Sequence, residues 1–404
     1  MEQRADWFEL EGYVDSSRGM HGVDVLFGTG RARQLADRFD RRGWQRPLIV
    51  CGSHVAGNTR LMDLARQALG ARDVEVFDGT SPDKTLASVY AGVEHMRAVG
   101  ADVLVGLGSG SSIDTARQMS VFGADGRPQS DFVDAARRGE QLRPRPTGGE
   151  LPVVLLPTTL PGGAISTTGS IEVLSAGDSP TGQPVRTFGY ITPDAVLHDP
   201  ELLATTPRGS LCGSAMNGIN KAIEAMYGRS ATPLSDAYAS QALHLISPNA
   251  AGMFAGDQAS LGAVSAGVML AQLRRNSSIL HAFGHAIARR SPLQQGIIHA
   301  VMAPPGLHFL FSKVDGRRRP LAQALGIDVT GRSRDALAEA VVAEVSRIRD
   351  ELGLPSSWDQ VDVPVTFDDD AVAAYACDER LMDNAPLDEP MTLAEAKTLL
   401  AAVR

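Results

Sequence analysis

The sequence has 404 residues, of which 43% are hydrophobic and 21% charged, so it is long enough for two large domains or three small ones. Its formal net charge of −9 and pI near 5.5 argue against nucleic acid or an anionic membrane as the main partner, because both attract basic surfaces. No apolar run approaches the ~18 residues of a membrane-spanning helix, and the start MEQRADWFELEGY lacks the pattern of a signal peptide, so we expect a cytoplasmic protein.

The first half of the chain alternates short apolar runs with amphipathic segments. Residues 1–20 match no pattern. The runs that predict strands are 23–28, 47–52, 73–79, 101–108 and 151–159. Their alternation with helical periodicity is typical of βαβ units and predicts a mainly parallel sheet. The segment 124–150 is rich in proline, glycine and arginine and predicts a long connection before a buried strand.

The hydrophobic pattern of the sequence changes near residue 199. Beyond it, strand-like runs disappear, and an Ala- and Leu-rich helical periodicity continues to the end. We therefore expect two domains, an α/β domain over residues 1–198 and an all-helical domain over residues 199–404.

A glycine- and serine-rich loop follows the run 101–108. It consists of Gly108, Ser109, Gly110, Ser111 and Ser112. We expect the next helix to carry Asp114 in its first turn. Backbone amides in such a loop can approach a phosphate, which the positive end of the helix favours. The spacing matches neither GxGxxG nor a Walker loop, so a simple Gly/Ser turn with a serine cap stays open.

A second loop follows the run 151–159 and reads LPTTLPGGAIST. It places Thr158 and Thr159 at the carboxyl end of a buried strand. Open α/β sheets bind their ligands at that edge, so two such loops together favour a dinucleotide site over a simple turn.

Two histidines, His281 and His285, lie four residues apart in SSILHAFGHAIARR. On a helix this spacing places both imidazoles on one face, one turn apart. Such a pair is half of a metal site, and the other half must come from elsewhere in the chain.

Several of these segments together resemble the iron-dependent alcohol dehydrogenase family. GSGSSIDTAR is similar to the family's GGGSxxDxAK loop, and LPTTLPGGAIST resembles its PTT loop. Residues 191–227 and 279–309 follow the helical domain of the family in the same order. The resemblance implies a dehydroquinate synthase-like fold, an active site between an α/β and a helical domain, and hydride transfer from a nicotinamide cofactor. It places the pyrophosphate of that cofactor on Gly108 to Ser112, and we expect Asp114 also to bind the cofactor.

The resemblance also locates the family's metal ligands, which are an Asp and a His four apart, the first His of an HxxxH and a later His. The corresponding residues here are Asn217, Lys221, His281 and Gln295. Amide oxygens bind divalent transition metals weakly, and an ammonium repels them. We therefore expect no tightly bound metal.

Lys221 supports two interpretations. Hydride addition to a carbonyl builds negative charge on oxygen, and an ammonium in the place of the ion can stabilise that charge or donate a proton. Asn217, one turn earlier on the same face, would orient this group or the substrate. Alternatively, Lys221 is a solvated helix residue that pairs with Glu224 at i,i+3.

The resemblance also assigns the histidine pair. His285 matches the histidine that relays protons near the nicotinamide, a role that suits its near-neutral pKa. His281, without a metal to bind, would hydrogen-bond the substrate or hold Lys221. We expect His299 and His308 to be structural.

Some departures resemble the maleylacetate reductases, a metal-free branch of the superfamily. Asn217 and the compact loop 156–167 fit that branch, whereas Lys221 and Gln295 replace histidines that it retains. Its Asn-Pro-Arg-Pro stretch is Leu387-Asp388-Glu389-Pro390 here, which argues against a dicarboxylate substrate. The sequence thus predicts a divergent, metal-independent reductase with a small or natural-product-type substrate.

The cofactor is expected to be NADPH or NADH. The family often has an Asp that repels a 2′-phosphate after the second strand, and the matching position here is Gly52. Loss of that charge permits NADPH, with Ser53, His54 or Arg60 as contacts. Arg117 stands at the lysine of the family loop and would keep a positive charge near the phosphates.

Three functions remain open. The first is a metal-independent NAD(P)H-dependent carbonyl reductase or alcohol dehydrogenase. The second is a non-redox cyclase, lyase or isomerase, because the related dehydroquinate synthases use this fold for elimination and cyclisation. The third is a cofactor-binding pseudo-enzyme. In each case we expect a small-molecule ligand and, from the resemblance, a homodimer.

Overall fold

The computed structural model describes residues 11–14, 23–160, 163–273, 277–314, 316–361, 363 and 365–403. The chain divides into two compact units, Met1–Thr206 and Pro207–Arg404.

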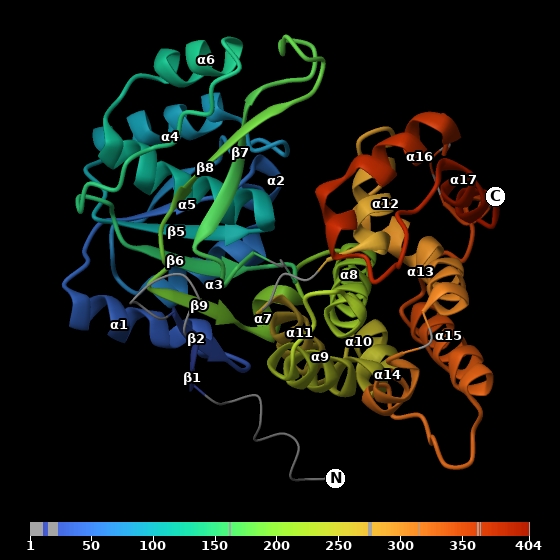
Figure 1. Ribbon diagram of the computed structural model, residues 1–404. Coiled ribbons are helices and arrows are strands. Elements are labelled where there is room, and N and C mark those ends of the chain that lie inside the picture. The colour runs from blue at the N-terminus through green and yellow to red at the C-terminus, as the bar shows by residue number, and fades with distance from the viewer. Residues whose placement is uncertain are drawn as a thin grey trace. The chain divides into compact units, whose positions relative to one another are not determined.

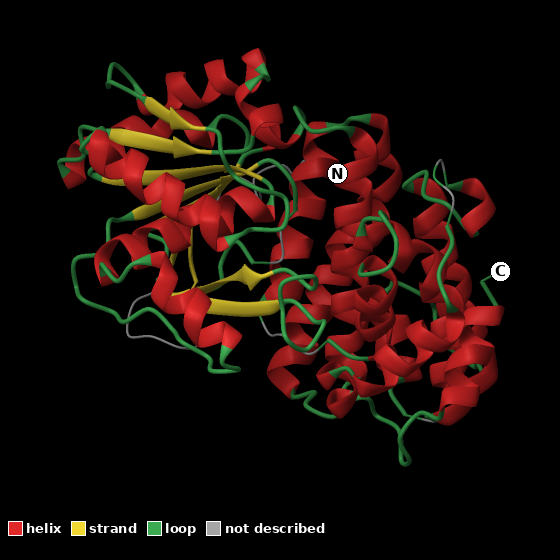
Figure 2. Cartoon of the chain, turned by 90° about the horizontal axis from the view of Figure 1, so that it is seen from above, coloured by secondary structure: helices red, strands yellow, loops and turns green. Residues whose placement is uncertain are grey.

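The first unit contains a seven-stranded sheet (Figure 2). In spatial order its strands are β1 (Glu11–Val14), β2 (Val23–Phe27), β9 (Ala195–His198), β6 (Val153–Pro157), β5 (Val103–Gly108), β3 (Pro47–Val50) and β4 (Glu75–Phe77). All neighbours pair in parallel except β1 and β2. Four of the inner strands, β9, β6, β5 and β3, are buried along their whole length. This burial explains why β5 and β6 are continuous apolar runs rather than alternating ones.

Helices cover both faces of this sheet (Figure 1). The helices of this unit are α1 (Leu35–Arg42), α2 (Ser53–Ala56), α3 (Thr59–Leu69), α4 (Leu86–Ala98), α5 (Gly110–Asp125), α6 (Gln129–Arg137), which packs on α4 and β7, and α7 (Pro200–Leu203), with the 3₁₀ turn η2 (Arg31–Gln34). On one face, α1 and α3 bury Phe39 and Leu61 against β3 and β5. Helix α5 packs against β5 and β6, and a separate hairpin of β7 (Thr168–Leu174) and β8 (Val185–Tyr190) lies against it.

The second unit consists of helices. They are α8 (Arg208–Tyr227), α9 (Pro233–Ile246), α10 (Ala250–Ala255), α11 (Gln258–Gln272), α12 (Ile279–Ala288), α13 (Gln295–Lys313), α14 (Arg318–Ala324), α15 (Arg334–Glu351), α16 (Asp369–Asp378) and α17 (Leu393–Ala401), with 3₁₀ turns η3 (Ser247–Asn249), η4 (Trp358–Gln360) and η5 (Arg380–Asn384). Helix α8 is central, because α9, α11, α12 and α13 all pack against it. It crosses α13 where Gly213 meets Gly296, and a Cβ on Gly296 would lie 2.0 Å from the Gly213 carbonyl oxygen.

The predicted fold class is confirmed, with a mainly parallel α/β unit followed by a helical unit. Differences are local. The connection 124–150 contains helix α6, and four strands, β1, β7, β8 and β9, lie outside the predicted runs. Residues 1–10 and 15–20 lie outside the described part of the chain, and residues 11–14 form β1.

The two compact units divide eight residues after the expected boundary at residue 199. The reason is Asp199, whose carboxylate accepts hydrogen bonds from the backbone amides of Gly30 (3.1 Å) and Ala32 (2.9 Å). Leu202, in the following short helix α7, joins the core of the sheet. These contacts place α7 in the first unit.

None of the described helices in either unit is long and apolar enough to cross a membrane.

Candidate functional site

Three predicted cofactor-binding segments meet at one edge of the sheet. Gly52 follows β3, Gly108 ends β5, and Thr158 follows β6, and these three strands are adjacent and parallel. Thr158 donates its backbone N–H to the Gly108 carbonyl at 3.0 Å. The fold therefore brings the predicted cofactor loops together at the carboxyl ends of the strands, where α/β sheets bind ligands.

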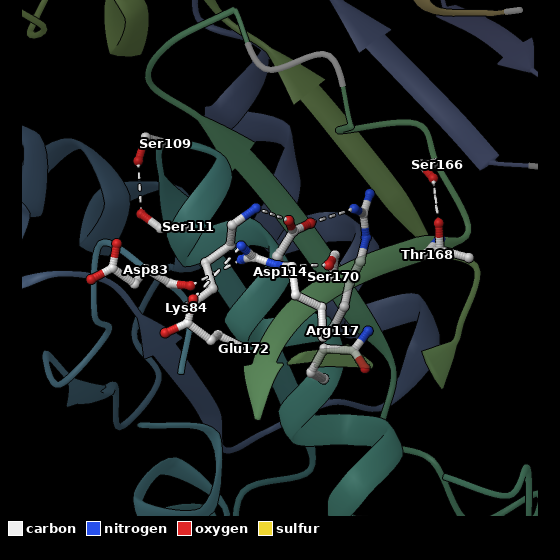
Figure 3. Close-up of polar contacts among 12 residues, drawn as sticks. Asp83, Lys84, Ser109, Ser111, Asp114, Arg117, Ser166, Thr168, Ser170 and Glu172 are labelled. Atoms are coloured by element: carbon white, nitrogen blue, oxygen red, sulfur yellow. Dashed lines mark hydrogen bonds and ion pairs between the residues drawn. The ribbon is translucent and has the colours of Figure 1, made fainter. Parts of the chain in front are cut away.

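The loop after β5 requires glycine at Gly108. Its φ is 132°, which L side chains rarely adopt, and a Cβ there would lie 2.8 Å from Ser112 Oγ. Ser109 is the N-cap of α5, but its hydroxyl bonds Ser111 Oγ (3.1 Å) instead of capping the helix (Figure 3). The first amides of α5, from Gly110 onward, are thus left for another acceptor. This arrangement fits the pyrophosphate of a dinucleotide.

The loops on either side differ in exposure. Thr158 is buried, and its carbonyl accepts the Thr206 hydroxyl at 2.6 Å, whereas Thr159 is half-buried. Residues 161 and 162 of the same loop lie outside the described residues. Gly52 is half-buried, and Ser53 is exposed at the start of α2.

Asp114 is an internal ion-pair partner. It lies one turn further into α5 than expected, because the helix begins at Gly110. Its carboxylate accepts from Lys84 Nζ at 2.8 Å and lies 3.4 Å from Arg117 (Figure 3). Gly169 packs so closely that a Cβ there would be 2.9 Å from the same carboxylate. The Asp114 carboxylate therefore pairs with two cationic side chains of the protein, those of Lys84 and Arg117.

Arg117, which was expected near the cofactor phosphates, is fully buried. Besides Asp114, its guanidinium donates to the carbonyl oxygen of Ala164. Its charge is therefore balanced inside the protein.

Lys84 was not predicted. Its φ of 58° is unusual for a residue with a side chain, and its carbonyl accepts the backbone N–H of Glu172 at 2.8 Å. Arg186 of β8 reaches the Asp83 carbonyl (3.1 Å) and Ser170 Oγ (3.2 Å), so the β7–β8 hairpin holds this turn (Figure 3). The only sequence signal was the polar turn SPDKT, and Asp114 lies 30 residues away.

In the helical unit, two of the four family metal positions are in direct contact. Asn217 Oδ1 lies 2.9 Å from His281 Nε2, which joins α8 to α12. Lys221, on the same face of α8, donates to Gln272 Oε1 at 2.6 Å. Gln295 opens α13 beside Gly296 at the crossing with α8.

Glu224 is the buried carboxyl beside these residues. The alternative interpretation of Lys221 paired it with Glu224, but the Glu224 carboxyl lies 2.5 Å from His281 Nδ1 and accepts the backbone amide of Leu280 at 2.7 Å. Burial raises its pKa to about 7, while these amide bonds and the Lys221 charge oppose the rise. The contacts of Glu224 with His281 and of Gln272 with Lys221 were not predicted, because the partners are more than 50 residues apart in the sequence.

The other histidines differ in environment. His285 is 36% exposed, with Nδ1 3.5 Å from Glu379; burial lowers its pKa, and Glu379 opposes this effect. His299 is fully buried, with its ring centroid 4.4 Å from that of His281, and burial lowers its pKa well below the usual value. His308 is half exposed.

These residues do not fit a divalent metal. His281 is the single imidazole in the set, and its two nitrogens already face Glu224 and Asn217. The remaining positions offer the amides of Asn217 and Gln295 and the ammonium of Lys221, which are poor ligands for transition metals. Across the described ranges, no three His, Cys, Asp or Glu side chains form a group that could hold a metal ion.

Comparison with known proteins agrees with this architecture. Residues 23–200 match the model of the iron-containing alcohol dehydrogenases, and residues 212–402 match the C-terminal model of the same family. The NAD-dependent methanol dehydrogenase of Bacillus methanolicus is 28% identical over 344 residues, covering 84% of this chain and 87% of that protein.

Solved structures share the fold. A 1,3-propanediol oxidoreductase superposes with a TM-score of 0.80 at 20% identity, covering 98% of this chain and all of that one. Maleylacetate reductase from Rhizobium sp. strain MTP-10005 gives 0.71 at 22% identity, covering 98% of each chain. At these identities the likeness shows the fold alone. The two family models together span both units, and the chain therefore belongs to the iron-containing alcohol dehydrogenase superfamily, whose members are oxidoreductases.

Proposed function

We propose that the protein is an NAD(P)H-dependent carbonyl reductase or alcohol dehydrogenase that uses Lys221 where its relatives use a metal ion. The observation that carries this proposal is the pair of hydrogen-bonding side chains, Lys221 and Asn217, in the helical unit. Lys221 and Asn217 share one face of α8, and Lys221 is held by Gln272. A cationic donor in this place suits the oxygen of a carbonyl, because that oxygen gains negative charge as hydride adds to carbon.

The nicotinamide cofactor, when bound, supplies or accepts the hydride. The first unit offers the Gly108 loop and the start of α5 for its pyrophosphate. In the helical unit, Lys221 stabilises the alkoxide that forms. His285, partly exposed and beside Glu379, takes part in returning a proton. A small-molecule substrate and a homodimer belong to the same proposal.

The test is turnover without metal. The purified protein is treated with a chelator, its iron and zinc contents are measured, and consumption of NADPH or NADH is followed with a panel of aldehydes and ketones. We expect coenzyme binding and full activity after chelation. Stoichiometric iron or zinc, together with activity lost on chelation, would contradict the role of Lys221. Coenzyme binding with product formation but no net oxidation would instead favour a non-redox cyclase, lyase or isomerase, and binding without any turnover a pseudo-enzyme.

The coenzyme preference gives a separate prediction at Gly52. Its φ of −91° is open to any residue, and an added Cβ would make only an ordinary contact, 3.7 Å from the Thr80 carbonyl oxygen. Gly52→Asp should therefore fold normally. The new carboxylate should repel a 2′-phosphate and lower kcat/KM for NADPH by about tenfold or more, equivalent to about 1.4 kcal/mol, while NADH is used as before.

The control for this substitution is Gly57→Asp, which adds the same charge at an exposed position in αR conformation after α2. It should leave the NADPH to NADH ratio unchanged. Equal loss of activity with both coenzymes in Gly52→Asp would show that the residue does not lie beside the ribose.

A further inference from the structure

Glu224 links two helices through a nearly complete set of hydrogen bonds. It is 4% exposed on α8, and its Oε1 accepts the backbone amides of Leu280 (2.7 Å) and His281 (3.2 Å) at the start of α12. Its other oxygen, Oε2, lies 2.5 Å from His281 Nδ1. The carboxyl group therefore fixes both the backbone and the ring of His281.

The opposite side of the same ring faces Asn217. His281 Nε2 lies 2.9 Å from Asn217 Oδ1, an oxygen that can only accept. The imidazole is 3% exposed, and burial together with the Lys221 charge keeps its pKa well below the usual value, which favours the neutral ring with one N–H. That hydrogen must lie on Nε2, because Asn217 Oδ1 can only accept a hydrogen bond.

The hydrogen between Glu224 and Nδ1 must then come from the carboxyl group. A protonated Glu224 donates from Oε2 to Nδ1 while Oε1 accepts the two amides, so each contact has one donor and one acceptor. Burial, which raises the pKa of Glu224 to about 7, favours this form at and below neutral pH.

This arrangement fixes the orientation of the side-chain amide of Asn217. Its oxygen is engaged by His281, so its amide hydrogens remain for a ligand, and the side chain is half-buried rather than enclosed. Lys221 lies one turn further along the same face of α8. With Glu224 ionised, Nδ1 would carry the hydrogen, and Asn217 would have to give its NH₂ to Nε2 and present its oxygen instead.

We propose that Glu224 is a positioning residue that sets the tautomer of His281 and thereby directs the amide hydrogens of Asn217, beside Lys221, to the oxygen of the substrate carbonyl. This inference rests on the proposed function for its substrate, but the tautomer itself does not depend on turnover. One amide N–H of Asn217 and the Lys221 ammonium, converging on an oxygen, form an oxyanion-binding group.

The tautomer is measured on the full-length protein without substrate, by nitrogen and carbon NMR of labelled histidines. His281 should show the Nε2–H form. Glu224→Gln should show the same form, because the glutamine NH₂ donates to Nδ1 while its oxygen accepts the backbone amides. Glu224→Met should lose it. His308, half exposed near Glu339, is the internal control and should not change.

Kinetics complete the test. Glu224→Met should lower kcat at least tenfold with little change in KM for the coenzyme, and Glu224→Gln should recover most of that loss. Asn217→Asp should retain the Nε2–H tautomer, because its carboxylate still accepts, but lose at least tenfold in kcat. An Nδ1–H tautomer in the wild type, or equal losses in Glu224→Gln and Glu224→Met, would overturn the proposal. A correct tautomer in a protein without reductase activity would overturn only the proposed function.

Discussion

Lys221→Met should lower kcat for carbonyl reduction by about 100-fold or more, the usual effect of removing one group that stabilises a developing oxyanion. Methionine keeps an unbranched side chain of similar length and removes the charge and the hydrogen-bond donors. KM for the coenzyme should change little, because the nucleotide loops belong to the other unit. Steady-state kinetics with both coenzymes give the two parameters separately.

The matched control is Lys313→Met. Lys313 is 43% exposed at the end of α13 and pairs with Glu395, so the same substitution there should leave the rate unchanged. Thermal unfolding should show that both variants fold. A wild-type rate in Lys221→Met would remove the ammonium from the reaction.

Asp114→Leu should destabilise the first unit by about 3–5 kcal/mol, because it leaves a buried charge without its partner. Arg117 is fully buried, and Asp114 is the carboxylate 3.4 Å from its guanidinium. Lys84 loses the same partner. Urea unfolding can be followed in this unit through Trp44, after Trp7 and Trp358 are replaced by phenylalanine.

The double variant Asp114→Leu/Arg117→Met should recover part of this loss, because neither buried charge then remains. Asp134→Asn is the control; its partner Arg137 lies 3.8 Å away, both side chains are more than half exposed, and the loss should stay below about 1 kcal/mol. If Asp114 instead contacts the coenzyme, Asp114→Asn would raise KM for NADPH and leave unfolding unchanged.

The sequence predicted the architecture because the inner strands are short, continuous apolar runs, as burial on both faces requires. β9 is a buried apolar run of four residues that was not predicted, although β3 is equally short and was. The β7–β8 hairpin also lies outside the predicted runs. Its strands are only partly buried and are separated by a polar turn rich in glycine and serine, so no continuous apolar run marks them.

The site was predicted in part. The Gly108 loop, Asn217, Lys221 and His281 stand out because local motifs surround them. Glu224 and Gln272 do not, because their role depends on packing between helices that are distant in the sequence. The motif predicted Asp114 and Arg117 near the ligand, whereas in the structure the two side chains form an ion pair with each other. Hydrogen-bond partners across a core cannot be inferred from spacing along the chain.

The pairing of β2 with β9 has a consequence for biosynthesis. β2 is the second strand to be synthesised, but it pairs with β9, one of the last strands of its unit to be synthesised, with Asp24 opposite Ala195. A nascent chain that has emerged only as far as β6 presents the free edge of that strand, and contacts so remote in sequence form slowly. During translation this half of the molecule should therefore need protection from association with other chains until β9 leaves the ribosome.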